Sequence, residues 1–99
     1  MNKIEYNVKK RIIAQFDDDA DAYDLAMGGL VKELCGMDES EMEKASLEIE
    51  KINSEFIRLA KEENAEEKLI NLIERYREEI ERENHMKDEI VDKEAETKL

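Results

Sequence analysis

Five aspartates lie within residues 17–24, in the segment DDDADAYD, and their density calls for a test of metal chemistry. Asp17, Asp19 and Asp21 have the 1, 3, 5 spacing of the first ligands in an EF-hand calcium loop. Such a loop also needs Gly at position 6 and a bidentate Glu at position 12, where this chain has Ala22 and Gly28. Calcium binding is therefore not predicted. We expect an exposed acidic knob, residues 17–24, of which part caps a helix.

The remaining candidates for chemistry are weak. Glu81, His85 and Glu89 share one face of a predicted helix, but a single histidine among carboxylates is a poor metal site. There is no second Glu-x-x-His segment of the kind used by di-iron bundles. Glycine-rich nucleotide loops and Cys-x-x-Cys pairs are also absent from the sequence. We predict a protein that is not an enzyme and that has no cofactor and no metal.

The single cysteine, Cys35, cannot form an internal disulfide, which is typical of a reducing compartment. We expect its side chain to be a small buried apolar group, since His85, the one histidine, lies in a distant charged segment. The first ten residues, MNKIEYNVKK, lack the apolar core of a signal peptide, and no stretch has the length of a membrane span. The sequence predicts a cytoplasmic protein.

The absence of proline and the scarcity of strict apolar–polar alternation predict an all-α fold. The strongest pattern is a heptad seam from Met42 to Leu59, which we expect to organise the fold because another helix must cover it. The heptad phase of this seam continues in a later segment of the chain, at Ile73 and Ile80. The predicted dimer or core seam comprises Met42, Ala45, Ile49, Ile52, Phe56, Leu59, Ile73, Tyr76 and Ile80.

Two shorter helices are predicted before this seam. The helix over residues 2–16 begins with an Asn2–Glu5 capping pattern and carries a net charge of +3. It is either a basic binding arm or, as we favour, a helix that pairs with the acidic remainder of its own fold. The helix over residues 19–35 contains Gly28 and Gly29, which either break it or allow another backbone to approach closely. We favour close packing, through Ala22, Ala26 and Gly29.

After Leu59, around Asn64, the positions of the heptad seam are no longer occupied by apolar residues. One interpretation is a continuous helix of about 50 residues, which would require a dimer to cover its seam. The favoured interpretation is a hairpin that bends near Asn64. The predicted architecture is a small bundle of about four helices, two short and N-terminal, two longer and C-terminal with coiled-coil-like packing, as a monomer or a homodimer. It comprises one domain, residues 1–93, and a frayed tail, residues 94–99.

The formal charge is −12, from 16 basic and 28 acidic residues. Such a surface repels nucleic-acid phosphates and anionic membranes, so neither is predicted to bind directly. A basic protein target is the natural complement, because opposite potentials steer association. The alternative is that the acidity serves solubility alone.

Together these features predict an inhibitor whose carboxylates imitate phosphates and occupy a basic, nucleic-acid-binding surface of another protein. The chain resembles, in size and composition, small acidic helical phage proteins that block restriction, CRISPR or nucleoid proteins. The predicted partner-binding residues are Asp17, Asp18, Asp19, Asp21, Asp24, Glu33, Asp38 and Glu39.

The alternative function is a coiled-coil dimerisation or adaptor module that recruits a partner helix. Its contact surface would be an exposed apolar stripe formed by Leu72, Tyr76 and Ile80. The two functions differ in their response to salt, because only the first depends on charge.

Overall fold

The computed structural model describes residues 1–98, with side chains described as far as His85, and this part of the chain forms four helices and no strand. They are α1 (Lys3–Phe16), α2 (Ala20–Cys35), α3 (Glu39–Ala60) and α4 (Ala65–Lys98). The predicted all-α bundle with two short and two longer helices is confirmed. None of the described helices is both long and apolar enough to cross a membrane. Fraying of residues 94–99 stays a prediction, since their side chains are not described.

Short polar residues begin the first three helices. At each start a side-chain oxygen accepts a hydrogen bond from the backbone N–H group three residues later. The acceptors are Asn2 (2.8 Å), Asp19 (3.1 Å) and Asp38 (2.8 Å). Each bond satisfies an N–H group that the first helical turn leaves without a partner. The helix starts therefore follow from local sequence, as the capping pattern predicted.

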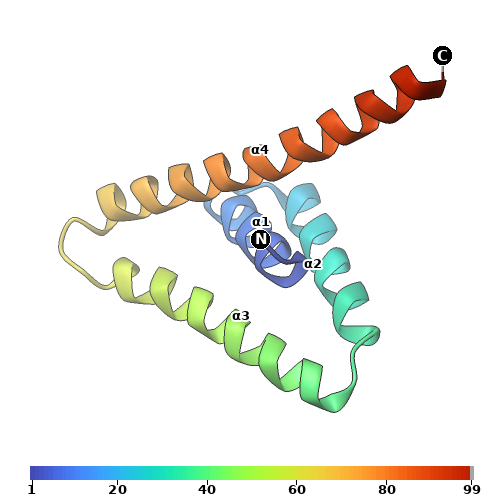
Figure 1. Ribbon diagram of the computed structural model, residues 1–99. Coiled ribbons are helices and arrows are strands. Elements are labelled where there is room, and N and C mark those ends of the chain that lie inside the picture. The colour runs from blue at the N-terminus through green and yellow to red at the C-terminus, as the bar shows by residue number, and fades with distance from the viewer. Residues whose placement is uncertain (99) are drawn as a thin grey trace.

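The two long helices are separate. α3 ends at Ala60 and α4 begins at Ala65, with Asn64 between them at a positive φ of 58°. Asn tolerates this left-handed conformation better than most residues because its short side chain can hydrogen-bond locally. The predicted hairpin is thus confirmed and the continuous rod is excluded. Figure 1 shows α3 and α4 meeting near this turn and diverging away from it.

Helix α1 lies at the centre of the molecule. In Figure 1 it is seen almost end-on, surrounded by α2, α3 and α4, and it packs against all three. Its residues Val8 and Ile12 are 0% and 1% exposed. The expectation that the Met42–Leu59 seam organises the fold is wrong in this respect. The physical reason is that α1 is apolar over a broad enough arc to be covered from several sides.

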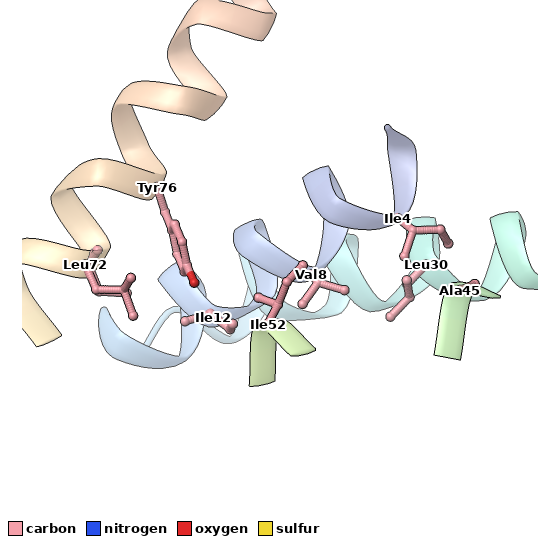
Figure 2. Packing of buried hydrophobic residues seen from close by; sticks show 9 residues of the cluster. Ile4, Val8, Ile12, Leu30, Ala45, Ile52, Leu72 and Tyr76 are labelled. Atoms are coloured by element: carbon pink, nitrogen blue, oxygen red, sulfur yellow. The ribbon is translucent and has the colours of Figure 1, made fainter. Parts of the chain in front are cut away.

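The seam itself forms one wall of the core. Figure 2 shows Ile52 of α3 beside Val8 of α1 and Ala45 of α3 near Leu30 of α2, with Tyr76 of α4 directed toward Ile12. Of the predicted seam, one member is exposed, Met42. The others are buried or half-buried in the core: Ala45, Ile49, Ile52, Phe56, Leu59, Ile73, Tyr76 and Ile80.

Helix α2 passes unbroken through its two glycines. A Cβ atom at Gly29 would lie 2.6 Å from Oδ1 of Asn7, so α1 approaches α2 closely at this point. Ala26, on the same side of α2, is buried. Close packing on a small residue is therefore found at Gly29, but the atoms that approach belong to the Asn7 side chain and not, as predicted, to a backbone. At Gly28 a Cβ atom would meet nothing within 4 Å.

Candidate protein-binding surface

The acidic knob lies where α1 ends and α2 begins. Asp17 caps the end of α1 through its backbone N–H group, and its carboxylate forms an ion pair with Arg77 of α4. Asp19 is occupied as the N-cap of α2. Asp18, Asp21 and Asp24 are exposed and have no partner among the described side chains. The knob therefore presents three unpaired carboxylates next to two that hold the turn in place.

The other predicted partner-binding residues lie at the opposite end of α2. Glu33 is half-buried and its carboxylate lies 3.7 Å from the Lys3 ammonium group. Asp38 caps α3, and Glu39 is exposed in its first turn. Asp24 and Glu33, the nearest members of the two groups, are nine residues apart on α2, which is about 14 Å along the helix axis. The eight residues thus form two clusters rather than one surface.

The turn of the knob is held rigidly. Asp18 has a positive φ of 55°, a conformation that short polar residues such as Asp adopt at low cost. The Asp19 backbone N–H donates to the Ala14 carbonyl oxygen at 2.9 Å. Together with the Asp17–Arg77 ion pair, these contacts hold the backbone of the turn in place. A partner therefore has less backbone freedom to remove at this turn when it binds.

A groove of about 320 Å³ adjoins the knob, between the end of α1, the start of α2 and the middle of α4. Ile13, Ala14 and Ile80 give it an apolar floor, while Asp17 and Arg77 stand at its edge. Sequence reasoning missed this groove because one of its walls comes from α4, which is distant in the chain from the consecutive ends of α1 and α2. A groove of this kind can receive an apolar side chain of a protein bound at the knob.

The cations of α1 are used inside the fold. Lys9 is buried, forms ion pairs with Glu5 and Glu79, and lies 5.0 Å above the Tyr76 ring centroid. Burial alone lowers the pKa of Lys9, but the hydrogen bonds with Glu79 and Glu5 outweigh it and the pKa is raised. Arg11 donates a hydrogen bond to the Asn53 side chain. The favoured interpretation of a helix that pairs within its own fold is therefore confirmed, and that of a basic binding arm is not.

The long helices neutralise part of their own acidity. Arg75 of α4 and Glu55 of α3 form an ion pair at 2.8 Å, and the hydrogen bond with Glu55 raises the pKa of Arg75. Glu62 lies 2.6 Å from Lys68 and 3.0 Å from Arg58, and the hydrogen bond from Lys68 lowers its pKa. At the knob Asp17 is compensated in this way by Arg77, whereas Asp18, Asp21 and Asp24 are not, and these three close-set carboxylates make the knob the candidate surface.

Two further expectations concern Cys35 and metal binding. Cys35 is exposed, so the expectation that it is buried is wrong; it follows Leu34 on the outer side of the last turn of α2. No group of three His, Cys, Asp or Glu side chains among the described residues is arranged to hold a metal ion. Glu89, of the set with Glu81 and His85, lies outside the described side chains.

The apolar stripe predicted for an adaptor is not a surface. Leu72, Tyr76 and Ile80 are all buried, so the expectation that they are exposed is wrong. The divergence of α3 and α4 leaves a space that α1 fills, and α1 covers this side of α4 (Figure 1). The adaptor function thereby loses the residues that were to perform it.

Comparison of the chain with protein-family models, with curated proteins and with solved structures finds no match, so the geometry of the surface carries the functional argument.

Proposed function

We propose that this is a non-enzymatic cytoplasmic protein that binds a basic, nucleic-acid-binding surface of another protein and so inhibits it. The observation that carries the proposal is the set of three exposed, unpaired carboxylates at the acidic knob, Asp18, Asp21 and Asp24. Inhibition of this kind suits a phage or mobile element that acts against host defence or takes over the host.

The spacing of the knob supports the proposal. Asp21 and Asp24 are neighbours three residues apart on α2, which places their Cβ atoms about 5–6 Å apart. Asp18 adds a third charge from the preceding turn. Binding of these carboxylates to a cationic, phosphate-binding groove would release counterions, much as the binding of DNA to such a groove does. The net charge of −12 would speed the encounter at low salt.

The proposal is tested by capturing a target from nuclease-treated lysate and measuring its affinity for two matched variants. Asp18→Asn/Asp21→Asn removes two charges from the knob. Glu43→Gln/Glu50→Gln removes two from exposed positions on α3 that have no partner among the described side chains. We expect the knob variant to bind about tenfold more weakly, equivalent to about 1.4 kcal/mol, and the α3 variant to change far less.

Competition completes the test. Duplex DNA should displace the protein from its target, and the affinity should fall steeply with added salt. Equal losses for the two variants, or simultaneous binding of DNA and this protein to the target, would refute the proposal.

A further inference from the structure

The outer side of α2 carries two large apolar side chains in water. Leu25 is 74% exposed and Val31 is 52% exposed, whereas Ala26 and Leu30, on the other side of the helix, are buried against the core. Figure 1 shows α2 at the edge of the molecule, with α1 on its inner side. Isolated exposed apolar residues are common, so these two gain significance only from what lies between them.

Gly28 lies midway between Leu25 and Val31 and has no role inside the chain. Glycine in a helix interior is about 1 kcal/mol less favourable than alanine. At Gly29 the approach of Asn7 accounts for that cost, but at Gly28 an added Cβ atom would meet nothing within 4 Å. The result is a flat spot on the exposed face, open to a backbone from outside the molecule.

The charges around Gly28 favour a second copy of α2 as that backbone. Asp24 and Lys32 lie four residues before and after Gly28, are exposed, and have no partner among the described side chains. In an antiparallel pair with a twofold axis at Gly28, each Asp24 comes level with the other copy's Lys32. Each Leu25 likewise comes level with the other copy's Val31. A parallel pair would instead bring like charges level with each other, which is unfavourable.

We propose that the protein forms a homodimer through an antiparallel, twofold-symmetric pairing of α2 helices that cross at Gly28. A twofold interface uses the same patch on both copies, and this patch is complementary to itself. The absence of a side chain at the crossing point lets the two backbones approach, and the helices diverge from it in both directions. Asp24 is used in the contact, but Asp18 and Asp21 lie beyond it, so each copy keeps these two carboxylates of the knob available for a target.

The dimer is weak and strengthens with salt. A single helix pair buries less than the roughly 1,200 Å² typical of stable complexes. Two copies that each carry −12 also repel one another, and salt screens this repulsion more than it weakens the short-range apolar contact. Association should therefore tighten when sodium chloride is raised from about 0.05 M to about 0.5 M.

Sedimentation equilibrium between about 10 µM and about 1 mM protein tests the proposal, with a reducing agent present because Cys35 is exposed. Leu25→Glu should weaken the dimer at least tenfold, roughly the effect of one well-placed contact. Leu47→Glu is the matched control, because Leu47 is 63% exposed on α3 and the substitution adds the same charge. Its dissociation constant should stay close to that of the wild type.

Gly28→Ala gives a second, independent measurement. The added methyl group has free space in the monomer, so the thermal midpoint of unfolding at low concentration should rise. In the dimer two such groups meet at the crossing point, so dimerisation should weaken. A monomer at every concentration, equal effects of Leu25→Glu and Leu47→Glu, or undiminished dimerisation of Gly28→Ala would each overturn the proposal.

Discussion

Lys9 joins the cationic helix to the acidic helices that surround it. Its ammonium group reaches Glu5 on its own helix and Glu79 on α4, and it stands over the Tyr76 ring. Both carboxylates are half-buried, so water still reaches them. This partial solvation lowers the desolvation penalty that makes fully buried ion pairs unfavourable. The network is therefore a stabilising contact that also fixes α4 against α1.

Replacing Lys9 with Met should destabilise the fold by about 1–3 kcal/mol, because two half-buried carboxylates lose their cation. Lys68→Met is the control, since Lys68 is exposed where Lys9 is buried, and ion pairs of exposed lysines contribute little. Urea denaturation of both variants measures the difference. A Lys9 variant no less stable than the Lys68 variant would show that the network has no role in stability.

Stability should fall at alkaline pH. The pKa of Lys9 is raised above 10.5, because its hydrogen bonds with Glu79 and Glu5 outweigh burial, and burial raises the pKa of Tyr76 above 10.0. The folded protein thus holds both protons more tightly than the unfolded chain does. Their contributions are complete below the unfolded pKa values and are lost as pH rises through the folded ones.

Urea titrations at pH values from about 9 to about 12 should accordingly show the free energy of unfolding declining from about pH 10 upward. The Lys9→Met variant lacks one of the two groups, so its decline should be shallower. A free energy of unfolding of the wild type that is constant or rises across this pH range would contradict the raised pKa values of Lys9 and Tyr76.

At the scale of the element, the turn between α3 and α4 decides whether the chain is a bundle or a rod. The segment around Asn64 contains no glycine or proline, and its neighbours are good helix formers. Asn64 nevertheless has a φ of 58°, and its carbonyl oxygen accepts a bond from the Lys68 N–H at 3.1 Å as α4 begins. One residue in a left-handed conformation thus separates two helices whose apolar seams share a heptad phase.

Asn64→Val should destabilise the protein by about 1–2 kcal/mol, because a β-branched side chain is strained at positive φ. Asn64→Gly should be tolerated, since glycine adopts this conformation freely. Glu63→Val is the control at a neighbouring position without a positive φ. The midpoints of thermal unfolding of the three variants check this order of stability. Equal midpoints for Asn64→Val and Glu63→Val would contradict a left-handed conformation at Asn64.

The helices were predictable because their signals are local. Caps at Asn2, Asp19 and Asp38 and the heptad spacing of α3 are patterns within one segment. Exposure was harder to predict, because it depends on which helix covers which. Leu72 is predicted in an exposed stripe but is buried, and Cys35 is predicted in the core but is exposed.

At the scale of the whole molecule, the fold separates the two signs of charge. The one segment with net positive charge, α1, is surrounded by helices that are net negative, and its Lys9 and Arg11 are used in internal contacts. Negative charge is therefore left outward, where the knob concentrates it. The functional proposal depends on this separation, because a basic arm free in solution would cancel the acidic surface.

The candidate site could be predicted only in part. The density of aspartates in residues 17–24 is visible in the sequence, and so is the use of part of this segment as a helix cap, which the structure assigns to Asp19. The ion pair between Asp17 and Arg77 and the groove beside it could not be predicted, because they join residues from opposite ends of the chain. The division of the acidic residues into two clusters follows from the length of α2.

The most direct test is native-state amide hydrogen exchange followed by NMR, because it measures whether α1 is held inside the bundle. We predict that the amides of Val8 and Ile12 exchange most slowly in the described part of the chain, only through global unfolding, while those near Asp24 on the outer side of α2 exchange sooner. Amides of α1 that exchange as fast as those near Asp24 would mean that α1 detaches as a basic arm, and the account would fail.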